Sequence, residues 1–69
     1  MNTQQVANQL TDALKGKSFA QQKAITDSFV PKFKAAEAPP QGLSLWVRRA
    51  LPSFGIAQEL VDQLAQALA

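Results

Sequence analysis

Apolar residues recur at intervals of three and four along most of the chain, a spacing that predicts amphipathic helices and no strand. The first predicted helix runs from about Gln4 to Lys15. Thr3 is expected to cap its first turn, and Gly16 is expected to close it in a left-handed conformation. Its apolar side chains form one stripe, made of Val6, Ala7, Leu10, Ala13 and Leu14. This helix therefore needs other elements to cover one of its faces.

A second helix is predicted to start at Ser18, because Ser18 and Gln21 have the spacing of a capping box. Its apolar side chains are spaced by four residues: Ile25, Phe29 and Phe33. Pro31 lies inside this pattern, where it removes a backbone N–H and crowds the preceding turn. We therefore expect either a kink at Pro31, or a stop near Phe29 followed by a short helix from Pro31 to Ala36.

The residues from Ala38 to Gly42 interrupt the helical pattern with two prolines and a glycine. Prolines hold the backbone extended and glycine permits a sharp turn, so this segment is predicted to be the corner between two helical pairs. A short third helix is expected from about Ser44 to Leu51, and Pro52 is expected to end it.

The last predicted helix starts at Phe54 or Ile56, ends near Leu68 and takes Ser53 as its cap. Its apolar stripe is the first candidate for a dimer or partner-binding face, and it contains Leu60, Val61, Leu64 and Leu68. The alternative is that the same stripe closes the core of a single chain.

The predicted fold is therefore all-α, a single domain over residues 1–69 built as a small bundle of about four short helices. A chain of 69 residues has a marginal core, and small domains commonly gain stability from a disulfide, a metal or a partner chain. The sequence has no cysteine and no histidine, so association with another protein, or with a second copy as a homodimer, is the remaining source.

The sequence offers no catalytic constellation and no cofactor motif, so we expect a protein that is not an enzyme and needs no cofactor. Its serines have no general base in their sequence context. Glu59 and Asp62 share a face of the last helix, but they lie among glutamines on its polar side.

A second candidate partner-binding surface lies around the turn between the third and fourth helices. Trp46, Arg48 and Arg49 belong to it, because tryptophan and arginine are enriched among the residues that dominate binding energy. Trp46 and Phe54 are also candidates because they lie in a stretch of high apolar density, and exposed apolar patches usually mark contact sites. The alternative is that Trp46 and Phe54 fill the core, while the arginines interact with the helix dipole.

Two other functions stay open at this stage. A nucleic-acid-binding protein would need its basic residues on one surface, and Lys23, Lys32, Lys34, Arg48 and Arg49 would meet if the second and third helices packed side by side. The net charge of +2 is low for that function. A membrane-active helical peptide is the other alternative, although the last helix has an acidic and neutral polar face.

The function we expect is a protein-interaction module of the adaptor, docking or inhibitor kind, which binds a partner protein or itself through an apolar helix face. No stretch is long and apolar enough for a transmembrane segment. The beginning of the sequence has no secretion signal and the chain has no cysteine, so we expect a cytoplasmic location.

Overall fold

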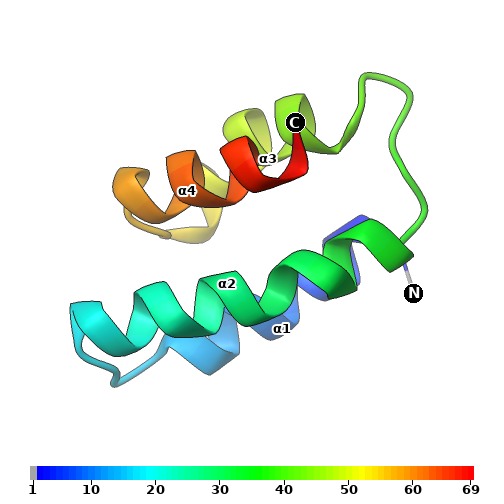
Figure 1. The fold of residues 1–69 in the computed structure, drawn as a ribbon. Helices are drawn as coiled ribbons and strands as arrows, with labels where there is room; N and C mark the ends of the chain where they lie inside the picture. Colours follow the sequence, from blue (N-terminus) through cyan, green and yellow to red (C-terminus); the bar gives the residue numbers. More distant parts are fainter. Residues whose placement is uncertain (1) are drawn as a thin grey trace.

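Two antiparallel helical hairpins make up the structure, a computed structural model that describes residues 2–69 (Figure 1). The first hairpin contains α1 (Thr3–Leu14) and α2 (Phe19–Ala35). The second contains α3 (Leu43–Ala50), a short 3₁₀ helix η1 (Leu51–Phe54) and α4 (Gln58–Leu68). The prediction of a small all-α bundle with four helices is confirmed.

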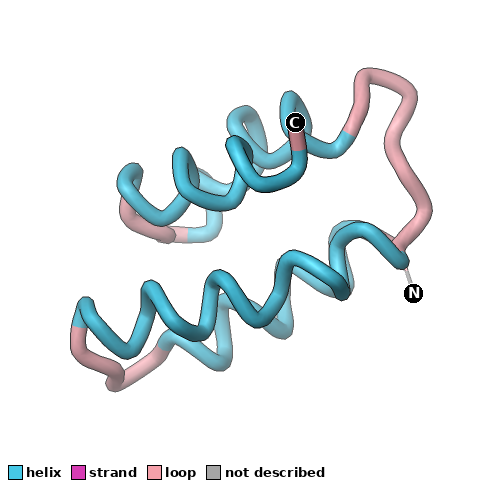
Figure 2. The backbone as a smooth tube through the Cα atoms, viewed as in Figure 1, coloured by secondary structure: helices cyan, strands magenta, loops and turns pink. Residues whose placement is uncertain are grey.

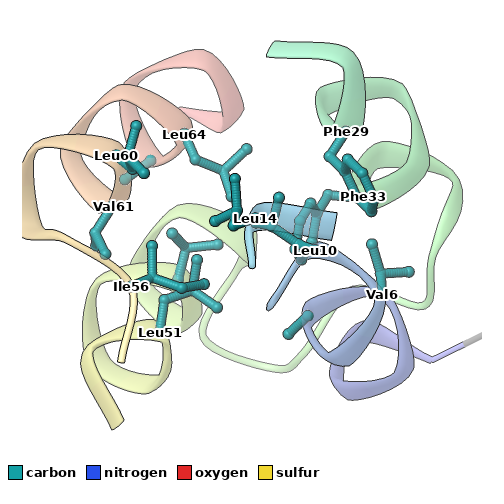
Figure 3. Packing of buried hydrophobic residues seen from close by; sticks show 13 residues of the cluster. Val6, Leu10, Leu14, Phe29, Phe33, Leu51, Ile56, Leu60, Val61 and Leu64 are labelled. Atoms are coloured by element: carbon teal, nitrogen blue, oxygen red, sulfur yellow. The ribbon is translucent and has the colours of Figure 1, made fainter. Parts of the chain in front are cut away.

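The two hairpins are held together mainly by α4, which packs against both α2 and α3, and by the contact of α1 with η1. A single cluster of buried apolar residues draws on all of these helices (Figure 3). Its members are Val6, Ala7, Leu10, Leu14, Phe29, Phe33, Val47, Leu51, Ile56, Leu60, Val61, Leu64 and Ala65. The apolar stripes predicted from the sequence thus converge on one core.

The start of α1 differs from the prediction, because Asn2 and not Thr3 caps the helix. The Asn2 side chain accepts a hydrogen bond from the Gln5 backbone N–H at 2.8 Å, and the Gln5 side chain accepts from the Asn2 backbone N–H at 3.0 Å. Asparagine caps a helix at least as well as threonine, and Gln5 is correctly spaced to complete a capping box with it.

Thr3 instead links the start of α1 to the end of α2. Its side chain is buried, and its hydroxyl donates a hydrogen bond to the backbone carbonyl of Glu37 at 2.6 Å. Asn2 and Glu37 also form an isolated parallel bridge. These contacts fix the beginning of the described chain against the loop that leads to the second hairpin.

The capping box predicted at the start of α2 is confirmed. The Ser18 hydroxyl accepts from the Gln21 N–H at 3.2 Å, and the Gln21 side chain accepts from the Ser18 N–H at 3.0 Å. Gly16, in the turn before it, has a φ of 71°, the left-handed conformation expected after α1. Local sequence therefore sets this turn at both of its ends.

Pro31 does not break α2, so of the two alternatives at this residue the stop near Phe29 is wrong. The helix runs without interruption from Phe19 to Ala35 (Figure 2). Pro31 lies on the exposed side, where water can bond the carbonyl that the missing N–H leaves free. Phe29 and Phe33 are buried on either side of it. Burying each phenylalanine is worth about 1.5–3 kcal/mol, so the pair offsets a proline cost of about 3 kcal/mol.

The predicted cap and start of the last helix are also wrong. Pro52 is accommodated in η1, and the Ser53 hydroxyl donates to the Ala50 carbonyl at 2.6 Å within that segment. Gly55 then adopts a left-handed conformation with a φ of 81°, and α4 begins only at Gln58. A proline fits the first turn of a helix because its missing N–H is not needed there. The chain therefore extends the third helix by a 3₁₀ turn instead of beginning a new one.

Candidate functional site

The apolar stripe of α4 lies mostly in the core. Leu60, Val61 and Leu64 are each at most 1% exposed, and they point toward residues from the other helices (Figure 3). Leu68 is partly buried and packs against the same cluster. In this arrangement the stripe closes the core of a single chain, and three of these four side chains have almost no surface left for a partner.

Trp46 and Phe54 both pack against the core while part of each side chain remains exposed. They lie on different elements, Trp46 in α3 and Phe54 in η1. Phe54 lines a hollow of about 400 Å³ between the α1–α2 turn and the junction of η1 with α4. The two residues predicted to form one surface therefore contribute to two different places.

The hollow beside Phe54 has apolar walls from Leu14, Ile56 and Leu60. Its polar side chains already have partners in the protein. The Thr11 hydroxyl donates to the Ala7 carbonyl at 2.9 Å, the Gln22 amide donates to the Leu14 carbonyl at 3.1 Å, and Lys15 pairs with Asp12 at 3.3 Å. Among residues 2–69, no buried side-chain nitrogen or oxygen lacks a hydrogen-bond partner. The hollow thus shows no polar group that requires a ligand.

The outward side of α3 carries the residue that sequence reasoning missed. Leu45 is 39% exposed, and only Phe19, at 43%, is a more exposed large apolar side chain in the described chain. Residues three and four positions apart are neighbours on a helix, so Leu45 lies between Arg48 and Arg49. The sequence contains part of the signal, because Leu43, Val47 and Leu51 share one side of the helix and Leu45 lies on the other. The structure then shows that this other side is exposed.

We call the surface formed by Leu45, Trp46, Arg48 and Arg49 the α3 face. Trp46 borders it on the side of Arg49, three residues away. The α3 face contains no carboxylate of its own, since the helix from Leu43 to Ala50 has no aspartate or glutamate. It combines an exposed aliphatic side chain, part of an indole ring and two guanidinium groups.

The two arginines of the α3 face differ in their partners. Arg48 forms an ion pair with Asp62 of α4 at 2.9 Å, and Asp62 also accepts a hydrogen bond from the Gln58 amide at 3.0 Å. Arg49 is exposed, and no carboxylate within residues 2–69 lies within salt-bridge distance of it. One arginine is therefore compensated by the protein itself, while the other has its charge free.

The basic residues considered for nucleic-acid binding do not meet on one surface, because α2 and α3 do not pack side by side. Those two helices lie at diagonally opposite corners of the bundle, and α4 packs between them (Figure 3). On α2, the Lys23 ammonium lies 5.8 Å from the centre of the Phe19 ring, and the Lys32 ammonium lies 4.4 Å from that of Phe29. Lys34, also on α2, is exposed. The lysines and the arginines thus belong to separate sides of the bundle.

The second exposed apolar residue, Phe19, has a different setting from Leu45. It is the first residue of α2, in the other hairpin, and its ring is partly covered by Lys23. Its neighbour Ser18 is engaged in the capping box. Phe19 therefore provides an exposed apolar side chain of similar size that lies outside the α3 face.

None of the helices between residues 2 and 69 combines the length and the apolar character needed to cross a bilayer. No group of three or more metal-ligating side chains was found in this part of the chain. Compared with known proteins, the chain matches no family model, no curated protein and no solved structure.

Proposed function

We propose that this protein is a non-enzymatic interaction module that binds a partner protein through the α3 face. The observation that carries the proposal is the exposure of Leu45 between two arginines, beside the partly exposed ring of Trp46. Arginine and tryptophan are enriched among residues that dominate binding energy, and an aliphatic side chain next to them supplies the apolar contact that drives association.

The closed core disfavours a homodimer formed through the α4 stripe. The 13 buried residues of the core cluster come from all helices of one chain. A homodimer formed by the α4 stripe would have to expose Leu60, Val61 and Leu64, which the fold already covers. We therefore assign binding to α3, where apolar surface remains uncovered. We also propose that this cysteine-free chain works in the cytoplasm.

The packing of α3 against the core and α4 also favours the α3 face as a binding surface. Val47 and Leu51 anchor the inner side of the helix in the core, and the Ser44 hydroxyl donates to the Ala65 carbonyl of α4 at 2.8 Å. A surface held in place by packing loses little conformational entropy when a partner binds. Leu45 is thus presented on a fixed helix and not on a loop.

The test compares Leu45→Asp with Phe19→Asp, because the two positions have similar exposure and lie on different hairpins. Proteins are captured from the cells that express the chain, with the wild type and both variants as bait, and are quantified by mass spectrometry. We expect a protein that the wild type and Phe19→Asp retain and that Leu45→Asp loses. Circular dichroism first establishes that both variants are folded.

Two outcomes contradict the proposal. One is a set of captured proteins that Leu45→Asp retains as well as the wild type does. The other is the capture of no protein above background by the wild type at the concentrations found in cells.

A further inference from the structure

We infer that the partner presents an acidic side chain beside an apolar one, so that its carboxylate pairs with Arg49 while its apolar side chain covers Leu45. This inference rests on the proposed function, and it adds the chemistry of the partner. It follows from the distribution of charge on and around the α3 face.

The α3 face is positively charged. The α3 helix carries two arginines and no acidic residue. The nearest carboxylate identified by a contact is that of Asp62, which already interacts with Arg48 and with the Gln58 amide. A partner therefore meets a surface with positive charge, and complementary charges favour an acidic partner over a basic one.

The two arginines of the α3 face differ in how far their charges are compensated. Arg48 and Asp62 are each about half exposed and form an ion pair at 2.9 Å, so the charge of Arg48 is largely compensated before any partner arrives. Arg49 has no such partner among residues 2–69. Its guanidinium has five donors in a planar fork that matches a carboxylate. The structure therefore assigns the ionic contact to Arg49, which has no carboxylate of the described chain to exchange, whereas Arg48 would first have to leave Asp62.

The phosphate backbone of a nucleic acid is the alternative to an acidic protein as the partner of the α3 face. Nucleic-acid binding requires several cations on one surface, because its affinity depends on the number of phosphates that are neutralised. The α3 face has a single uncompensated arginine, and the lysines of α2 lie at the diagonally opposite corner of the bundle (Figure 3). One free cation next to an exposed leucine fits a carboxylate beside an apolar side chain.

The experiment is a selection of random displayed peptides on the immobilised chain, carried out in parallel on the wild type, Arg49→Glu, Arg48→Gln and Leu45→Asp. We expect the wild type and Arg48→Gln to enrich peptides with Asp or Glu next to Leu, Ile or Phe. We expect Arg49→Glu to enrich Lys or Arg at the same place. Circular dichroism establishes beforehand that each variant is folded.

The binding affinity of a synthetic version of the most enriched peptide then measures how much each arginine contributes. Arg49→Gln should weaken its binding about fivefold, which corresponds to about 1 kcal/mol, and Arg48→Gln should weaken it less than about twofold. Raising the salt concentration should reduce the affinity of the wild type but have little effect on Arg49→Gln.

The outcomes separate this inference from the function on which it rests. Peptides that need Leu45 but carry no acidic residue, or that Arg49→Glu selects unchanged, overturn the inference and leave the proposed function intact. Peptides that bind Leu45→Asp as well as the wild type, or no enrichment at all, contradict the proposed function itself. A random-sequence DNA oligonucleotide that binds the wild type more tightly than the enriched peptide does, and that Arg49→Gln no longer binds, overturns the inference in favour of a nucleic acid.

Discussion

The two hairpins differ in what fixes the beginnings of their helices. In the first hairpin, both helices start with a capping box made by neighbouring residues. In the second, Gly42 and Ala57 occupy the capping positions, and neither gives its helix a side-chain cap. The second hairpin is instead fixed by contacts between distant residues, such as the 2.8 Å hydrogen bond from Ser44 to the Ala65 carbonyl. Local sequence thus specifies the first hairpin, whereas tertiary packing specifies the one that carries the α3 face.

The largest effect should come from removing packing in the second hairpin. Leu64 is fully buried in α4, the helix that packs on both α2 and α3. Leu64→Ala should lower the free energy of unfolding by about 2–5 kcal/mol, because it removes buried apolar surface and leaves a cavity. Urea unfolding followed by circular dichroism measures this loss. Leu68→Ala, at a partly buried position of the same helix, should cost clearly less.

The same unfolding experiment tests whether the two hairpins unfold together. Trp46 is the only tryptophan, so its fluorescence reports on the second hairpin, while circular dichroism reports on both. Because α4 joins the two hairpins, we expect both signals to change at the same urea concentration in Leu64→Ala. A fluorescence transition at clearly lower urea would show that the second hairpin unfolds alone.

Removing a cap from the first hairpin should have the next largest effect. Ser18→Ala deletes the hydroxyl that accepts the Gln21 N–H, and it should lower the free energy of unfolding by about 1 kcal/mol. Ser53→Ala is the matched control, because the Ser53 hydroxyl caps no α-helix and donates only to the Ala50 carbonyl. Its cost should be about 0.5 kcal/mol or less. Equal losses at the two serines would contradict the role assigned to the capping box.

Adding a cap to the second hairpin should have a smaller effect of opposite sign. Ala57→Ser supplies a hydroxyl that can accept from the N–H of Glu59 or Leu60, and we expect a gain of about 0.5 kcal/mol. The gain is small because the Leu60 N–H already donates to the Ala57 carbonyl at 3.0 Å. Thermal unfolding measures it. Ala67→Ser, at an exposed position late in α4, should give no gain, since serine there only lowers helix propensity.

The smallest effect on stability should come from the ion pair between the two helices of the second hairpin. Asp62→Asn removes the partner of Arg48, and both side chains are about half exposed. We expect a loss of about 0.5 kcal/mol or less at low salt, and a still smaller loss at high salt, because exposed ion pairs are weak and screened. A loss above about 1.5 kcal/mol would mean that the pair organises the second hairpin.

The contrast between the hairpins also explains which parts of the fold were predictable. The apolar periodicity predicted all four helices, because each stripe is buried against the others. Of the two helix starts that nearby residues set, the capping box at Ser18 was predicted correctly, whereas the cap of α1 was assigned to Thr3 instead of Asn2. The start of α4 was not, because η1 and Gly55 postpone it, and no local pattern distinguishes a 3₁₀ extension from a new helix. The stop at Pro31 was left open for a similar reason, since the burial of Phe29 and Phe33 against other helices decides the effect of this proline.

The α3 face was only partly predictable. Arg48, Arg49 and Trp46 were identified from their residue types, but the exposure of Leu45 depends on how a short helix packs. The α4 stripe could not be assigned from the sequence, because an apolar stripe has the same spacing whether it covers a core or binds a partner. The ion pair between Arg48 and Asp62 joins residues 14 positions apart, and no local pattern predicts it.

The hydrogen bond from Thr3 to the Glu37 carbonyl has a consequence for the order in which the chain folds. It closes the first hairpin on itself, so α1, α2 and the start of the following loop are joined by contacts that need no residue of the second hairpin. The turn of the first hairpin joins residues as little as 8 positions apart, as in the bond from the Gln22 amide to the Leu14 carbonyl, whereas the hydrogen bonds from Gln63 of α4 to α2 join residues 36 and 40 positions apart and have a larger loop-closure entropy. On the ribosome, residues 3–37 also emerge before α3 and α4. We therefore expect the α3 face to form last, by condensation of the second hairpin on a first hairpin that is already closed.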